Sequence, residues 1–212
     1  MKLAALLRNG SWGVAAASLL CAGAVWAQPP APTQPSTMQR SWNLIGANAR
    51  LQQKLDAKTA HRGQTVEAKL NSTVNTASGM RLDRGTELWG KVDRVQASMD
   101  GGPSTLSVVF TRAQLKNGHS IPVKVTVIGV YPSDEEQLAV NGDETMPAAP
   151  RHVSSNFRVD QQPGMIGHVS LHSAVESRES ATFRDARGNL KIGRGTYLQL
   201  GIASANGSSL QG

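Results

Sequence analysis

The chain has 212 residues, of which 22 are lysine or arginine and 15 are aspartate or glutamate, giving a formal net charge of +7. Aromatic residues make up 4% of it, and no run of four basic residues occurs. Proteins that bind nucleic acids usually cluster their cations and combine them with stacking rings. The composition therefore argues against a nucleic-acid partner.

The first 27 residues have the pattern of a secretory signal peptide. Lys2 and Arg8 form a positive start, residues 13–27 are apolar and uncharged, and Val25 and Ala27 are small side chains where a signal peptidase would cut. An uncleaved anchor is the alternative, but a spanning helix needs about 20 apolar residues. We expect an exported protein, periplasmic or extracellular, with no transmembrane span in its mature form.

Lipidation at Cys21 is a second alternative, although Leu20 stands where a small residue normally precedes a lipidated cysteine. Loss of residues 1–27 removes two bases and the single cysteine, so the mature chain would carry a net charge of +5. Such a chain has no disulfide, thiol nucleophile or thiolate metal site. Its length suits one domain with its own core.

Composition divides the chain into a signal peptide, a proline-rich linker, a β-domain and a flexible tail, at residues 1–27, 28–46, 47–204 and 205–212. The linker has four prolines in residues 28–37, which favours an extended tether. Residues 133–164 are polar and interrupted by proline. They predict a long mobile loop that the fold could do without.

Apolar residues alternate with polar ones along most of the domain, which predicts β-strands. The clearest strand is 121–131, where Val123, Val125 and Val127 share one face. Residues 47–58 fit a strand or a helix. The other expected strands are 64–74, 86–95, 106–111, 165–175, 181–184 and 190–203. About eight strands joined by turns indicate an all-β fold, a single antiparallel barrel or sandwich.

Two segments share one pattern. Residues 82–92 read LDRGTELWGKV and residues 192–202 read IGRGTYLQLGI. In both, a glycine suited to a tight turn precedes a threonine that starts an apolar strand. We expect structural turns at Gly85 and Thr86, and at Gly195 and Thr196; two ordinary hairpins would also give this pattern.

The first of these segments also carries a resemblance to a known family. Residues 63–95 (GQTVEAKLNSTV…RLDRGTELWGKVDRV) resemble the β-barrel domain of TrbI-like proteins, the outer-channel scaffold of conjugation and type IV secretion machines. Segments 106–110, 114–118, 121–127 and 195–200 fit later parts of that barrel. The resemblance implies a barrel fold and, at most, a scaffold role.

The chain departs from that family in two ways. Its members usually have a cytoplasmic tail with an uncleaved spanning helix, whereas this chain begins with a cleavable signal. They also have an apolar helical hairpin that lines a pore, and residues 133–164 are too polar for that.

A second resemblance lies in residues 55–70 and 115–132, which are similar to exported acidobacterial-type proteins of unknown function. In those proteins the first of these segments leads directly into the first barrel strand. This likeness favours a strand over residues 48–55.

Two groups of side chains could suggest chemistry. His168 and His172 are four residues apart, but on a strand that spacing is about 13 Å, too far for both to bind one zinc ion at about 2 Å each. Acids are concentrated in the long loop, where paired carboxylates could serve glycoside hydrolysis, although a solvated loop explains them: Asp134, Glu135, Glu136, Asp143 and Glu144. With no catalytic motif in the sequence, we predict no enzyme activity, no cofactor and no metal.

Two tryptophans, Trp42 and Trp89, could stack on sugars. Trp89 is out of phase with Leu88 in its strand and could point outward, next to Lys91 and Arg94. We take Trp89, Lys91 and Arg94 as the candidate surface for a ligand or partner.

Three functions remain open. The first is a structural or interaction domain of the cell envelope, with an envelope protein as partner. The second is a barrel that binds polysaccharide, and the third is a hydrolase. The sequence leaves the oligomeric state open.

The signal peptide predicts that the mature protein begins at Gln28. N-terminal mass analysis of the exported protein measures this directly. A start at a lipidated Cys21 would mean that the mature protein is anchored to a membrane.

Overall fold

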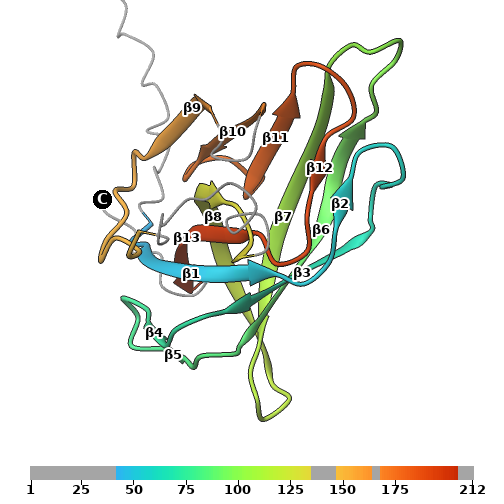
Figure 1. Ribbon diagram of the computed structural model, residues 1–212. Helices are drawn as coiled ribbons and strands as arrows, with labels where there is room; N and C mark the ends of the chain where they lie inside the picture. Colours follow the sequence, from blue (N-terminus) through green and yellow to red (C-terminus); the bar gives the residue numbers. More distant parts are fainter. Residues whose placement is uncertain (1–41, 135–146, 164–167, 205–212) are drawn as a thin grey trace, which may run out of the picture. The chain divides into compact units, whose positions relative to one another are not determined.

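The computed structural model describes residues 42–134, 147–163 and 168–204. These residues contain thirteen β-strands (Figure 1). The residues predicted to form a signal peptide and a tail, most of the predicted linker, and the acids Glu135, Glu136, Asp143 and Glu144 lie outside these residues. The described residues contain no helix that could cross a membrane. The strands are β1 (Ile45–Leu51), β2 (Leu55–Asp56), β3 (Thr65–Leu70), β4 (Val74–Asn75), β5 (Arg81–Leu82), β6 (Glu87–Gln96), β7 (Ser104–Gln114), β8 (Ser120–Tyr131), β9 (Arg158–Pro163), β10 (Val169–Ala174), β11 (Ala181–Asp185), β12 (Lys191–Ile192) and β13 (Tyr197–Ser204).

Six of these strands close into an antiparallel barrel. Their order is β6-β3-β1-β13-β8-β7, and β7 pairs back with β6. Closure gives each of the six strands a hydrogen-bonded neighbour on both sides. The predicted all-β barrel is therefore confirmed, and residues 47–58, which fitted a strand or a helix, contain most of β1 and the short strand β2.

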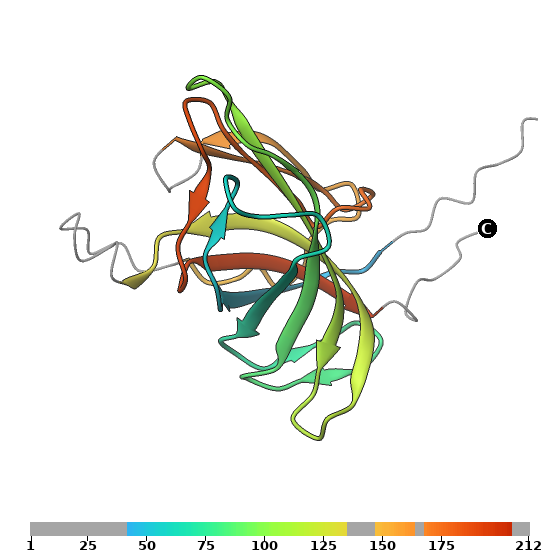
Figure 2. The ribbon, with the colours of Figure 1, turned by 90° about the vertical axis from the view of Figure 1, so that its right-hand side faces the viewer.

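Strands β11, β10 and β9 continue the sheet away from the barrel (Figure 2). They attach through β7, which has 11 residues and serves two neighbours along one edge. Its end, Arg112–Gln114, pairs with β8, whereas its first half, from Ser104 to Val108, pairs with β11. The rest of β8 turns away to pair with β13.

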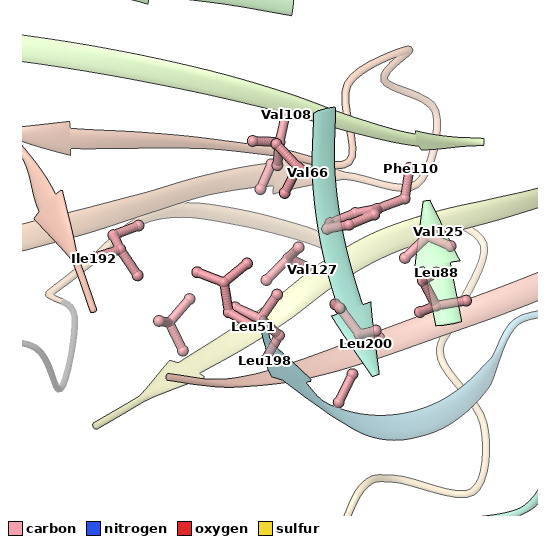
Figure 3. Packing of buried hydrophobic residues seen from close by; sticks show 14 of the residues in the cluster. Leu51, Val66, Leu88, Val108, Phe110, Val125, Val127, Ile192, Leu198 and Leu200 are labelled. Atoms are coloured by element: carbon pink, nitrogen blue, oxygen red, sulfur yellow. The ribbon is translucent and has the colours of Figure 1, made fainter. Parts of the chain in front are cut away.

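The barrel interior is filled by side chains that point inward from all six strands (Figure 3). Burying a residue of this kind contributes about 1.5–3 kcal/mol. Those labelled in Figure 3 from these strands are at most 2% exposed: Leu51, Val66, Leu88, Val108, Phe110, Val125, Val127, Leu198 and Leu200. Ile192 of β12 packs in the same cluster. The alternation that predicted the strands thus places their apolar faces in one core.

The barrel consists of two matching three-stranded halves, β3-β6-β7 and β1-β13-β8. Lys69 pairs with Glu87 as Arg50 pairs with Tyr197, and the match continues through five positions of each pair. A β-bulge interrupts the pairing of the second strand with the third at the same place in both halves. It follows Trp89 in the β6–β7 pairing and Gln199 in the β13–β8 pairing. The repeated sequence is therefore a repeated structure.

The repeated turn is equally alike in both halves. Gly85 and Gly195 have φ angles of 87° and 88°, a conformation that favours glycine. Each donates its N–H to the last residue of a neighbouring strand, Gly85 to Leu70 and Gly195 to Leu51, both at 2.8 Å. Thr86 and Thr196 are buried and directly precede β6 and β13, so the repeated sequence forms the same turn in both halves.

The interpretation of residues 133–164 as one loop is wrong for its described part, whereas the expectation that the fold can do without them stays a prediction. Val153 is 6% exposed and bridges Leu44, and Arg158–Pro163 form strand β9. The sequence did not predict these elements, because a single bridge and a short edge strand show no long alternation of apolar and polar residues. This segment covers a second apolar cluster outside the barrel, formed by Leu44, Ile128, Val153, Val175 and Ala203, with Trp42 and Phe157 packed against it.

We predict that Val123→Asp unfolds the domain. Val123 is 5% exposed in the barrel core, and a buried, unpaired charge costs several kcal/mol out of a total stability of about 5–15 kcal/mol. Thermal unfolding followed by circular dichroism measures the effect. The matched control is Val109→Asp, because Val109 is half-buried on the outer face; equal effects would contradict the assignment of the two faces.

Candidate functional site

The outer face of β3, β6 and β7 carries three rows of side chains that the strand register places side by side. The rows are Lys69–Glu87–Gln114, Glu67–Trp89–Arg112 and Thr65–Lys91–Val109. All nine residues are out of phase with the core residues of these strands and are half-buried or exposed. We call these rows, with the flanking Arg62, Arg84, Arg94, Lys116 and Arg178, the basic face.

Two β-bulges turn cations onto this face. Thr111 is the extra residue between the pairs Trp89–Arg112 and Gly90–Phe110, and Asp93 is the extra residue between Val92 and Arg94. Strict alternation from Lys91 would point Arg94 toward the core. The bulge shifts the phase by one residue, so Arg94 is exposed like Lys91.

Most cations of the basic face have no charged partner. Within the part of the chain that the structure describes, seven of them form no ion pair: Arg62, Lys69, Arg84, Lys91, Arg112, Lys116 and Arg178. Three carboxylates lie among them, on Glu67, Glu87 and Asp93. The face therefore has a net positive charge, which attracts anions and steers their approach.

Two hollows lie on the basic face, one on each side of Trp89. The larger has a volume of about 560 Å³ and is lined by Lys69, Arg84, Gly85, Glu87, Gln114, Leu115 and Lys116. The smaller, of about 250 Å³, is lined by Arg62, Gly63, Lys91, Val92, Asp93, Val109, Thr111 and Arg178. Each hollow has three cations and one carboxylate, so each favours a negatively charged group.

Trp89 lies in the middle row and is half-buried. Its indole Nε1 is buried and has no hydrogen-bond partner among the described residues. Part of its ring is open to a ligand, but the indole N–H is not.

Of the three residues predicted to form a partner surface, Trp89 and Lys91 occupy adjacent rows of the basic face. Arg94 lies farther along β6, where it forms an ion pair of 3.0 Å with Glu179 and so links β6 to the turn between β10 and β11. An exposed ion pair contributes at most about 1 kcal/mol.

The strand expected over residues 165–175 begins at Val169 in the structure, so the two histidines do not lie on one strand. His172 is within β10 and pairs with Thr182 of β11, whereas His168 precedes that strand and is 72% exposed. The His168 Nε2 atom lies 3.6 Å from Asp185 Oδ2. The described residues contain no group of three potential metal ligands.

Sequence reasoning missed six cations as members of the site: Arg62, Lys69, Arg84, Arg112, Lys116 and Arg178. They are far apart in the chain, and the strand register and two bulges bring them together. The Arg-Gly-Thr pattern was the one available signal, since it placed Arg84 at a turn next to β6.

Comparisons with known proteins extend the description of the fold. No family model and no curated protein matches the chain, so the likeness to acidobacterial-type proteins stays an expectation. Among solved structures, the chain is similar to ComB10 of the Com type IV secretion system of Helicobacter pylori. The two share 12% identity and a TM-score of 0.35, over 77% of this chain and 88% of that one. At this similarity the function is inferred from the basic face alone.

We predict that the positive charge of the basic face increases the quenching of Trp89 fluorescence by iodide. In a chain that begins at Gln28, Trp42→Phe leaves Trp89 as the single tryptophan. A positive potential concentrates iodide near the ring at low ionic strength. Neutralising Lys91 and Arg112 to Gln should lower the quenching constant for iodide and leave that for neutral acrylamide unchanged. Equal changes for both quenchers would show that the substitutions altered access to the ring, not its potential.

Proposed function

We propose that this chain is an exported structural or interaction domain of the cell envelope, without enzyme activity, that binds an anionic partner through the basic face. One observation carries the proposal: seven cations that form no ion pair with the described residues gather on one outer face of a closed barrel. Keeping like charges together costs free energy, which an anionic partner would recover.

The composition of the hollows supports binding over hydrolysis. Glycoside hydrolysis uses two carboxyl groups that flank the bond to be broken. Glu87 is the single carboxylate of the larger hollow and Asp93 that of the smaller one. Cations dominate both, and they bind anions without reacting.

A barrel that binds an acidic polysaccharide is the second candidate. Trp89 favours it, because an indole ring between two positively charged hollows could stack on a sugar whose neighbours carry carboxylates. Since Trp89 is only half-buried, its ring offers a surface for such a contact.

Site-specific photo-crosslinking in cells tests the proposed function. A photoreactive amino acid at Thr65, in the third row of the basic face, should give an adduct with an envelope component. The same group at Arg184, exposed on β11, is the control and should give little. Lys91→Gln with Arg112→Gln should remove the adduct at Thr65. Equal labelling at both positions, or adducts insensitive to these charges, would contradict the proposal, and an adduct with polysaccharide would support the second candidate.

A further inference from the structure

The two matching halves of the barrel allow the basic face to be compared with its counterpart on β1, β13 and β8. Lys69 corresponds to Arg50, Glu87 to Tyr197, and Gln114 to Tyr131, because each set forms the same row of its half. The turn residues Arg84 and Gly85 correspond to Arg194 and Gly195. The groups that cover the counterpart face indicate which kind of ligand the basic face could bind.

On the counterpart face, a carboxylate of the chain itself fills the corresponding place. Asp134 Oδ2 lies 2.7 Å from the Nη2 atom of Arg50, and the Tyr197 hydroxyl donates to Asp134 Oδ1 at 2.6 Å. Arg50 also donates to the Tyr197 hydroxyl. Burial and the hydrogen bond to Asp134 raise the pKa of Tyr197, so this phenol stays protonated as a donor.

The chain also lays its own backbone over the rest of the counterpart face. The amide of Gln199 donates to the carbonyls of Pro147 and Ala148, at 3.3 and 3.2 Å. Gly46 lies so close to Pro150 that an added Cβ would be 1.7 Å from its carbonyl oxygen. This face is therefore occupied by a polypeptide segment and an acidic side chain.

The basic face has no such covering among the described residues. Lys69, the counterpart of Arg50, forms no ion pair there, and Lys116 and Lys69 both place their Cε atoms beside Gly85. These two cations and Arg84 line the hollow of about 560 Å³, with Glu87 as its single carboxylate. The hollow thus has cations like the counterpart site, but none of the described residues takes the place of Asp134.

We propose that this hollow binds an acidic side chain of a peptide segment from a partner protein, in the place that Asp134 takes on the counterpart face. The inference rests on the proposed function and names the chemistry of the partner. Arg84 offers the planar fork that binds a carboxylate through two hydrogen bonds, and the two lysines add point charges. Among the described residues, no aromatic ring lines the hollow, which argues against a nucleotide, since bases are commonly held by stacking.

The counterpart also indicates where on the basic face the peptide would lie. Gly46 and Gly201, which allow the close approach of the covering segment, correspond to Thr65 and Lys91. Their side chains would keep a backbone farther from the sheet at that end. The peptide would therefore approach most closely at the row of Lys69, over the larger hollow.

Fluorescence anisotropy with a fluorescein-labelled hexaglutamate peptide tests this site, on a chain that begins at Gln28. The variant K69Q/R84Q/K116Q should bind the peptide at least about tenfold more weakly than the unsubstituted chain, the combined effect of three exposed ion pairs. The control K58Q/R184Q/R194Q removes the same charge at exposed positions without ion pairs in the described residues, and should change the affinity less than about twofold. Thermal melts confirm that both variants are folded.

The repeat supplies a still closer comparison in two single substitutions. Arg84→Gln and Arg194→Gln alter the same position of the same turn, but only Arg84 lines the hollow. Arg84→Gln should weaken peptide binding, and Arg194→Gln should not. Equal losses in both would overturn the site, because they would reflect net charge alone.

Two further probes separate this inference from the proposed function. A labelled hexaglutamine peptide should not bind. If inorganic polyphosphate binds at the hollow and hexaglutamate does not, the peptide inference is wrong and the anion-binding face stands. If no anionic probe binds and Thr65 gives no charge-dependent adduct in cells, the proposed function fails as well.

Discussion

The pairing of β6 with β7 along the whole of β6 is the constraint on which the rest of the structure depends. It closes the sheet into a barrel and encloses the inward side chains of six strands in one core. Because β8 pairs with β7 at Arg112–Gln114 alone, the first half of the same edge of β7 is left to pair with β11 and to carry the strands beyond it. The same pairing aligns Glu87, Trp89 and Lys91 with residues of β7, so the barrel and its basic face arise from one register.

The bulge at Thr111 in this pairing affects both the core and the basic face. A bulge inserts one residue and reverses the phase of the side chains that follow. At Thr111 it allows Phe110 to point inward while Thr111 and Arg112 are both exposed. The corresponding bulge in β8 leaves Ile128 on the outside, where it packs in the second apolar cluster. One local irregularity thus supplies a cation to an open face in one half and an apolar contact to a covered face in the other.

The two halves of the barrel show how similar backbones reach different surfaces. The turns at Gly85 and Gly195 have nearly the same geometry, and their strands pair in the same register. Side chains alone distinguish the outer faces. Glycines at positions 46, 129 and 201 leave space on one of them, and its Arg50 is neutralised by Asp134. The corresponding positions of the other face carry Thr65, Arg112 and Lys91, whose side chains would keep a backbone segment farther from the sheet.

The sequence by itself determined the fold class, most of the strands and the structural turns. Alternation places valines and leucines on one side of a strand whatever its neighbours are, and a glycine with positive φ is a local requirement, so Val123, Gly85 and Gly195 were predictable. Tertiary structure alone decided the rest. Bridges such as Leu44–Val153 are too short to show alternation. The cations of the basic face are scattered along the chain, and they meet because strands from distant segments pair in one register, which no local pattern of residues specifies.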